Sequence, residues 1–279
     1  MLPFMPSTGT IPECRLVNGS TGDPLLFIDY PGKNNALLFD SGELCRLEPE
    51  RLADLEAVFI THHHMDHFVG FDRILRANLD SDKVVHIFGP EGTIARIYQR
   101  ITSYAIPFFP FQKVVFKVHE VLEKRLRWTF LDCARHFPEP VLEESRWKGP
   151  LIFENPERMV EAVHVDHTVP CLAYALVEKK TGVRLAYITD TLWSVKVRPR
   201  LVKLATRANR LFCDSYYALA DKKSAATHKH MTATHAAQLA RQAKVQELIL
   251  MHFSTRYRDH YQALVDEARA IFPNVSAEW

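Results

Sequence analysis

The sequence predicts a layered α/β fold, because segments typical of strands and of helices alternate along the chain. Two β-meanders are expected, over residues 13–40 and 113–165, where short apolar runs are separated by turn residues. Between them come an apolar strand ending at Ile60, an amphipathic helix over 68–79, a strand over 84–88 and a helix through about Thr102. This order indicates sheets covered by helices.

Length and composition indicate an ordinary globular protein. The chain has 279 residues, which fits one large domain or two tightly joined halves. No internal repeat, low-complexity tract or flexible linker is present, so we expect a single domain over residues 1–279. The net charge of +2 is too balanced to predict or exclude nucleic acid as a partner.

Cysteine usage and the N-terminal residues bear on the cellular compartment. The five cysteines are scattered and form no CxxC pair, which fits a reducing compartment. Residues 1–9 contain no basic segment followed by a long apolar run, and no stretch of about 18 apolar residues occurs elsewhere. We therefore expect a cytoplasmic protein with no signal peptide and no membrane partner.

The strongest motif lies directly after the strand that ends at Ile60. His62, His64, Asp66 and His67 follow the pattern His-x-His-x-Asp-His. His62 and His64 are two residues apart on an extended segment, so they project to the same side and can bind one metal ion. Asp66 and His67 belong to the turn that opens the next helix and should serve a neighbouring ion. His63 should face the other way, as a structural histidine.

Further ligands are expected at the ends of later strands. His167, Asp190 and His252 each follow an apolar run, as the first motif does, and each residue type is a common ligand of zinc. A lone histidine after a strand is usually structural. The three residues together with the first motif instead indicate a metal site.

These residues resemble the metallo-β-lactamase superfamily, and within it the ribonuclease Z-like phosphodiesterases. The resemblance rests on the His-x-His-x-Asp-His motif followed by His167, Asp190 and His252. It also rests on Asp40-Ser-Gly-Glu, Ile188-Thr-Asp-Thr, His230-Met-Thr-Ala and His252-Phe-Ser-Thr-Arg-Tyr. It covers residues 14–260 and implies a four-layer αββα sandwich of two mixed sheets with outer helices.

The resemblance also implies a dinuclear metal centre. It assigns His62, His64 and His167 to one ion, and Asp66, His67 and His252 to the other, with Asp190 as the bridge. Nitrogen and oxygen ligands suit zinc, and manganese or iron also fit because no thiolate is present. A homodimer is usual for this family. Asp40 fits either a plain turn or a role in bracing the metal ligands.

Two metal ions can activate a bridging hydroxide as the nucleophile for phosphodiester cleavage. His230 is our candidate for the donor that protonates the leaving alkoxide, oriented by Asp214. The family usually has glutamate at the position of Asp214, which makes the proton relay less certain in this chain. Asp66 is a further candidate catalytic residue. Arg256 and Ser254 are candidate substrate-binding residues, although Arg256 also fits a plain surface arginine.

For three other features the sequence does not decide the role. Basic residues gather in a helix expected over 195–210 and in a loop before His230, where they form either a solvated surface or a groove for phosphates. The aromatic patch over 101–116 fits a core-covering loop, a pocket wall or a dimer contact. We interpret residues 135–150 as an exposed, irregular segment.

One departure from the family concerns the substrate. Ribonuclease Z enzymes that cut tRNA precursors generally carry a protruding arm between the positions of His167 and Asp190, and only residues 168–189 lie there in this chain. We therefore expect a phosphodiesterase for a small phosphodiester, such as a cyclic nucleotide. The alternatives are a tRNA 3′-processing endoribonuclease, a hydrolase of lactones, thioesters or β-lactams, and a non-catalytic RNA-binding protein.

Overall fold

The computed structural model describes residues 11–279, which fold into two compact units. The first unit comprises Glu13–Lys148, His164–Leu172 and Trp279, and the second comprises residues 11–12, Gly149–Val163 and Ala173–Glu278. Each unit is built on its own mixed sheet, which confirms the predicted fold class. The single domain over 1–279 stays a prediction. The stretch 1–9, on which we based the absence of a signal peptide, lies outside the described residues.

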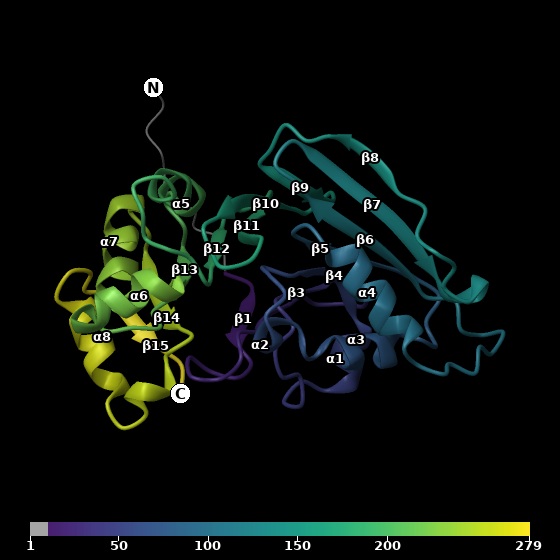
Figure 1. Cartoon of the computed structure of the whole chain (residues 1–279), viewed down its shortest axis with the longest axis horizontal. Helices are drawn as coiled ribbons and strands as arrows, with labels where there is room; N and C mark the ends of the chain where they lie inside the picture. Colours follow the sequence, from purple (N-terminus) through teal and green to yellow (C-terminus); the bar gives the residue numbers. More distant parts are fainter. Residues whose placement is uncertain (1–10) are drawn as a thin grey trace. The chain divides into compact units, whose positions relative to one another are not determined.

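The sheet of the first unit has eight strands in the order of the sequence (Figure 1). They are β1 (Glu13–Leu16), β2 (Leu26–Asp29), β3 (Ala36–Phe39), β4 (Leu55–Phe59), β5 (Val84–Gly89), β6 (Val115–Val121), β7 (Arg125–Asp132) and β8 (Glu143–Arg146). Strands β3 to β6 run parallel, and the neighbouring pairs at both sides are antiparallel. Both predicted meanders contribute to this sheet.

Helices cover one face of this first sheet. They are α1 (Pro49–Ala53), α2 (Met65–Phe68), α3 (Phe71–Asn78) and α4 (Thr93–Thr102), and a short 3-10 turn η1 (Cys133–Arg135) follows β7. Apolar side chains of α3 and α4 recur at helical spacing and are buried in one core with those of β3 to β6, so burial of an amphipathic face holds these helices in place. The helix predicted through Thr102 is thus confirmed, and the one predicted over 68–79 is confirmed as α3, which begins only at Phe71 because a turn at residues 69–70 separates it from α2.

The second unit has a seven-stranded sheet in the order β15-β14-β13-β12-β11-β10-β9. Its strands are β9 (Leu151–Glu154), β10 (Arg158–Val165), β11 (Cys171–Glu178), β12 (Arg184–Ile188), β13 (Arg210–Asp214), β14 (Glu247–Met251) and β15 (Val275–Ala277). Strands β12 to β15 run parallel, whereas β11 runs antiparallel to β12. The parallel strands are almost wholly buried, as expected for strands that run beneath helices.

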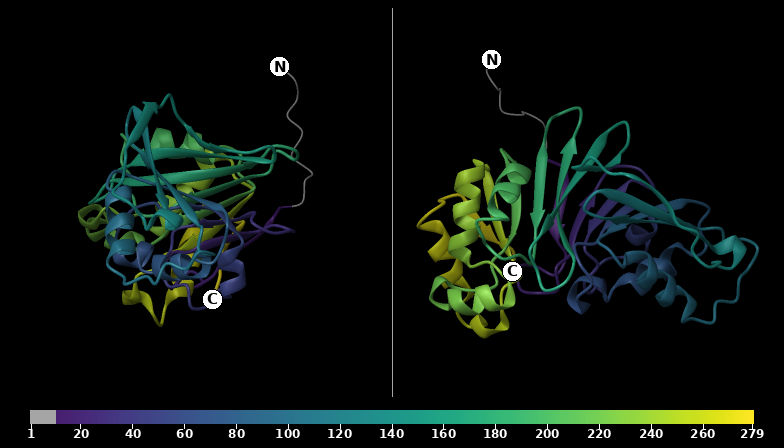
Figure 2. Two further views of the ribbon diagram at one scale, coloured as in Figure 1. Left: turned by 90° about the vertical axis from the view of Figure 1, so that its right-hand side faces the viewer. Right: turned by 45° about the horizontal axis from the view of Figure 1, so that its top comes forward.

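Helices of the second unit pack beside β12 to β15, as the right-hand view of Figure 2 shows. They are α5 (Arg198–Ala205), α6 (Lys222–His228), α7 (Ala233–Ala243) and α8 (Tyr261–Arg269), with 3-10 turns η2 (Leu219–Asp221) and η3 (Thr255–Tyr257). In residues 11–279, every helix is too short or too polar to cross a membrane.

Three expectations about local structure need correction. The helix expected over 195–210 is limited to α5, because Pro199 stands in its first turn and Arg207 adopts a left-handed conformation just after its end. The basic stretch before His230 is helix α6 and not a loop. The aromatic patch is divided, since Phe116 lies in the core while side chains of the preceding loop are exposed, namely Tyr104, Phe109 and Phe111.

Candidate active site

In each unit, the candidate residues stand at the carboxyl ends of adjacent parallel strands. In the first unit Asp40 follows β3, and the segment from Thr61 to His64 follows β4. In the second unit Asp190 follows β12, Asp214 ends β13 and His252 follows β14. Parallel strands end at the same edge of a sheet, so each sheet gathers its polar side chains at one place. This explains why strand-end residues found by sequence alone become neighbours.

Three imidazoles converge in the first unit. The rings of His62, His64 and His167 lie with centroids 4.5–5.0 Å apart, and their ligand atoms are within 4.8 Å of one another. His62 and His167 are buried, and the Nε2 atom of His167 is 3.3 Å from Nδ1 of His64. Three borderline nitrogen donors at this spacing suit a zinc-type divalent ion.

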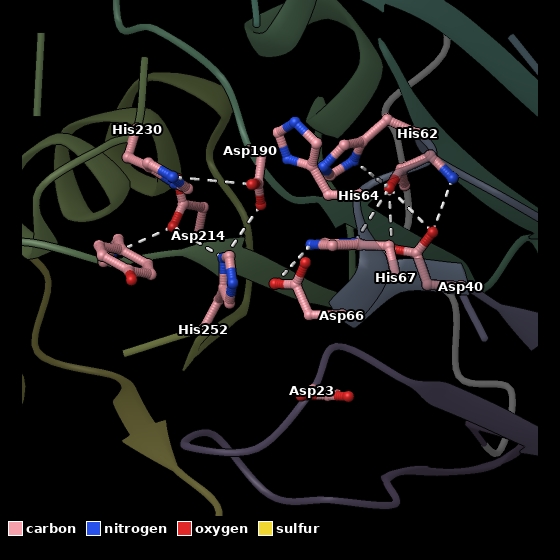
Figure 3. Close-up of polar contacts among 12 residues, drawn as sticks. Asp23, Asp40, His62, His64, Asp66, His67, Asp190, Asp214, His230 and His252 are labelled. Atoms are coloured by element: carbon pink, nitrogen blue, oxygen red, sulfur yellow. Dashed lines mark hydrogen bonds and ion pairs between the residues drawn. The ribbon is translucent and has the colours of Figure 1, made fainter. Parts of the chain in front are cut away.

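The Asp40 carboxylate positions His67, a further histidine of the first motif. This carboxylate is wholly buried and lies 2.8 Å from Nδ1 of His67 (Figure 3). The same carboxylate accepts hydrogen bonds from the amide and hydroxyl of Thr61, at 2.7 and 2.8 Å. With Nδ1 engaged in this way, Nε2 of His67 is the nitrogen that is available to bind a metal ion. The contacts favour the bracing role of Asp40 over a plain turn.

The turn after Asp40 is fastened to the helix that carries His67. The amide of Ser41 donates to the carbonyl of His67, and the amide of Gly70 donates to the carbonyl of Ser41. A side chain at Gly70 would meet the carbonyl oxygen of Gly42 at 2.2 Å, so only glycine fits this close approach. The ligand-bearing turn is therefore held at both ends.

Asp66 and His67 form a further pair of candidate metal ligands in the first unit. The Nε2 atom of His67 is 3.6 Å from the carboxylate of Asp66. Asp23, which sequence reasoning missed, lies beside them: burial, and next the Asp66 carboxylate, raise the pKa of its own carboxyl group. Asp23 follows no apolar run, so no sequence signal pointed to it.

His63 and His164 have structural surroundings. His63 points away from the other imidazoles, with its Nε2 atom 3.0 Å from the Thr93 hydroxyl, and burial holds its pKa at about 3. The ring of His164 contacts Trp147 edge to face. His63 was predicted to be structural, and its contacts agree with that prediction.

In the second unit, carboxylates and imidazoles alternate. His252 Nδ1 is 3.0 Å from Asp190, His230 Nε2 is 3.7 Å from Asp190, and His230 Nδ1 is 3.2 Å from Asp214 (Figure 3). Ligand atoms of Asp190, His230 and His252 lie within 4.8 Å of one another. The amide of Met231 also donates to Asp214, at 2.9 Å, and so fixes that buried carboxylate.

These contacts set the charge state of His230. Burial opposes a charged imidazole, but the carboxylates of Asp214 and Asp190 outweigh it and raise the pKa of His230. The pKa of Asp214 is lowered, because the attraction of His230 overcomes the cost of burial. The shorter aspartate therefore reaches His230, and the pair can hold a proton on the imidazole.

Tyr216 and the segment after His252 complete this side. The Tyr216 ring stacks on His230 with centroids 4.3 Å apart, a contact that no sequence pattern predicted. Ser254 caps η3 by accepting a hydrogen bond from the Arg256 amide. Arg256 forms an ion pair with Asp221 at 3.2 Å and lies over the Tyr217 ring. Substrate binding by Ser254 and Arg256 stays a prediction.

A family model described as "Beta-lactamase superfamily domain" matches residues 37–253, which include every candidate metal ligand. The chain belongs to the metallo-β-lactamase superfamily. It is 29% identical to ribonuclease Z of Deinococcus radiodurans, over 85% of this chain and 88% of that protein. Its place in the ribonuclease Z-like branch is thus confirmed.

Two solved structures share the fold. The metallo-β-lactamase fold protein YhfI of Bacillus subtilis matches with a TM-score of 0.66 at 17% identity, over 93% of each chain. The short form of human tRNase Z matches with a TM-score of 0.64 at 22% identity, over 88% of this chain and 93% of that chain. These two structures show the fold, and the ribonuclease Z relatives make the protein a metal-dependent hydrolase of a nuclease and phosphodiesterase family.

Proposed function

We propose that the protein is a phosphodiesterase that works with two divalent metal ions, and zinc is the first choice over manganese and iron. The observation that carries this proposal is the contact of His230 with Asp214 on one side and with Asp190 on the other. A proton donor beside a ligand-type carboxylate serves a reaction that expels a poor leaving group, as the cleavage of an alkyl phosphodiester does.

The side chains of both units suit the metal ions. His62, His64 and His167 would hold one ion, while Asp66, His67 and His252 would hold the other, with Asp190 as a shared ligand. Support comes from within each unit: the three converging imidazoles, the Asp40–His67 contact and the Asp190–His252 contact. Bound ions would activate water and neutralise charge on the phosphate oxygens.

His230 would act at the leaving oxygen. Asp214 binds Nδ1 of His230, so Nε2 is the nitrogen that can pass a proton onward. Burial opposes a charged imidazole, but the Asp214 and Asp190 carboxylates outweigh it and raise the pKa of His230, which favours the protonated form. Tyr216 packs against the flat side of the imidazole and limits its rotation.

The substrate we propose is a small phosphodiester. Strands β11 and β12 are joined by a tight hairpin in which the amide of Gly182 donates to the carbonyl of Glu178, so the stretch between His167 and Asp190 forms two strands and a turn. This supports the absence of a substrate-binding arm there. Cleavage of tRNA precursors is the second candidate, favoured by the names of the curated relatives.

The test is hydrolysis of bis-4-nitrophenyl phosphate by protein loaded with zinc, manganese or iron. We expect turnover that Asp190→Ala abolishes, while Asp259→Ala, which removes an exposed carboxylate, leaves it unchanged. Cyclic nucleotides and precursor tRNA are then compared side by side to decide between the two substrates. Hydrolysis of lactones with no turnover of any phosphodiester would replace the proposal by a carbon-centred hydrolase.

A further inference from the structure

An aromatic and basic cluster lies on the second unit, just beyond Asp190. The Trp193 indole stacks on the His235 imidazole, with centroids 6.0 Å apart and planes inclined by 24°. The guanidinium of Arg198 lies over the same indole, 5.7 Å from its centroid. Trp193 and His235 are half-buried, whereas Arg198 is exposed. The three residues form the Trp193 cluster.

Local hydrogen bonds hold the cluster in a fixed geometry. Thr232 and His235 form a capping box at the start of α7, in which the His235 amide donates to the Thr232 hydroxyl and the Thr232 amide donates to the imidazole. On the other side, the carbonyl of Ser194 accepts hydrogen bonds from the amides of Val197 and Arg198. The His235 ring and the backbone that carries Arg198 are therefore held before any ligand arrives, which lowers the entropic cost of binding.

The cluster lies next to the residues that would perform the chemistry. Trp193 is three residues beyond Asp190, and His235 is five residues beyond His230. Asp190 and His230 are themselves 3.7 Å apart. Three residues of chain reach at most about 10 Å, so Trp193 lies within the neighbourhood of any group attached to a phosphate bound at Asp190.

The segment that carries Trp193 and Arg198 is basic. Residues 191–213 contain six basic side chains and no carboxylate. Arg210 is engaged by Glu247, but Arg198 makes no ion pair within the part of the chain that the structure describes. An exposed guanidinium that rests on an indole offers a flat cationic surface, which is a common binding surface for nucleobases and phosphates.

We propose that Trp193 and Arg198 form the subsite for the nucleoside that flanks the cleaved phosphodiester. The base stacks on the guanidinium, and the indole beneath keeps that cation flat and in place. This inference rests on the proposed phosphodiesterase function and narrows its substrate class to nucleotide diesters. Loss of one stacked base typically weakens binding by a factor of about 5 to 150.

The experiment compares two diesters with the same leaving group, thymidine 5′-(4-nitrophenyl phosphate) and methyl 4-nitrophenyl phosphate. In the metal-loaded protein, Arg198→Ala should raise KM for the thymidine diester by a factor of about 5 to 150. Its kinetics on the methyl diester should not change. Lys203→Ala is the matched control, because Lys203 is an exposed cation of the same helix. Equal effects of Arg198→Ala on both diesters, or none on either, would overturn the subsite.

A binding measurement separates this inference from the proposed activity. In metal-free protein, a thymidine dinucleotide should quench the fluorescence of Trp193, and the quenching should saturate. Trp193→Phe keeps an aromatic ring but should lose the signal, and Arg198→Ala should shift the midpoint to higher concentration. A protein that cleaves no phosphodiester but shows this pattern contradicts the function alone. Quenching that is the same in Arg198→Ala contradicts the subsite alone.

Discussion

The two units use the same topological device for different chemical purposes. In both, neighbouring parallel strands deliver polar side chains to one edge of a sheet. In the first unit the side chains at that edge are mostly imidazoles, and the buried Asp40 fixes one of them from behind. In the second, Asp190 and Asp214 alternate with His230 and His252, so each imidazole lies beside a carboxylate. The first arrangement favours tight metal binding, and the second favours proton transfer.

The largest expected effect follows from removal of the candidate proton donor in the second unit. His230→Ala should lower the turnover of an alkyl phosphodiester by a factor of about 100 to 10,000, because the leaving alkoxide loses its proton donor. Turnover of bis-4-nitrophenyl phosphate should change far less, since 4-nitrophenolate leaves without a proton. Rates on both substrates measured for one protein preparation provide the comparison. Equal losses on the two substrates would remove His230 from the proton-donor role.

The second prediction compares two buried carboxylates, Asp40 in the first unit and Asp214 in the second. Asp40→Asn keeps the size of the side chain but removes the charged acceptor for His67 and Thr61, so zinc affinity should fall by a factor of about 10 to 100. Asp214→Asn should lower zinc affinity less than Asp40→Asn does. Its main effect should be slower turnover of substrates with poor leaving groups. Competition with a chelator measures the affinity, and Asp82→Asn, at an exposed carboxylate, is the control.

The opposite pattern would reverse our assignment of the two units. If Asp214→Asn lost zinc and Asp40→Asn kept it, the second unit would be the principal metal-binding side. If both variants lost zinc equally, the two carboxylates would not differ in function as we predict.

Several candidate metal ligands could be found from the sequence because they follow apolar runs that are typical of strands. His62, Asp190 and His252 all lie just past such a run, and the fold brings strand ends together. Asp214 was instead a candidate as the partner of His230 at a position where the family usually has glutamate, and its shorter side chain left the contact in doubt. The structure removes that doubt with a distance of 3.2 Å.

Other parts of the site depend on tertiary packing that leaves no local pattern. Asp23 is adjacent to Asp66 only because the loop before β2 packs there, and Tyr216 stacks on His230 across 14 residues of chain. Helix α6 was missed because seven residues with three basic side chains show no apolar periodicity. The end of α5 depends on the left-handed conformation of Arg207, a residue type that does not predict it.

The last and smallest effect compares two buried histidines of the first unit. His67 contacts the Asp40 carboxylate, whereas the Nε2 atom of His119 lies 3.4 Å from Nδ1 of another imidazole, His86. Burial first, and then the charges of His86 and Lys117, hold the pKa of His119 at about 3. The unfolded chain binds a proton there below about pH 6.5, while the folded protein does not, so stability must fall as pH drops from about 6.5 towards 3.

At pH 5 this difference amounts to about 2 kcal/mol of unfolding free energy. His119→Phe removes the titrating group and can keep the stack on Phe88, whose ring lies 4.2 Å away and nearly parallel. The loss of stability between pH 7.5 and pH 5, measured by urea unfolding of metal-free protein, should therefore be about 2 kcal/mol smaller in the variant. His260→Phe, at an exposed histidine, should not change it. An unchanged loss in His119→Phe would mean that His119 gains its proton in the folded state, and that a buried imidazole in this unit needs no carboxylate to carry charge.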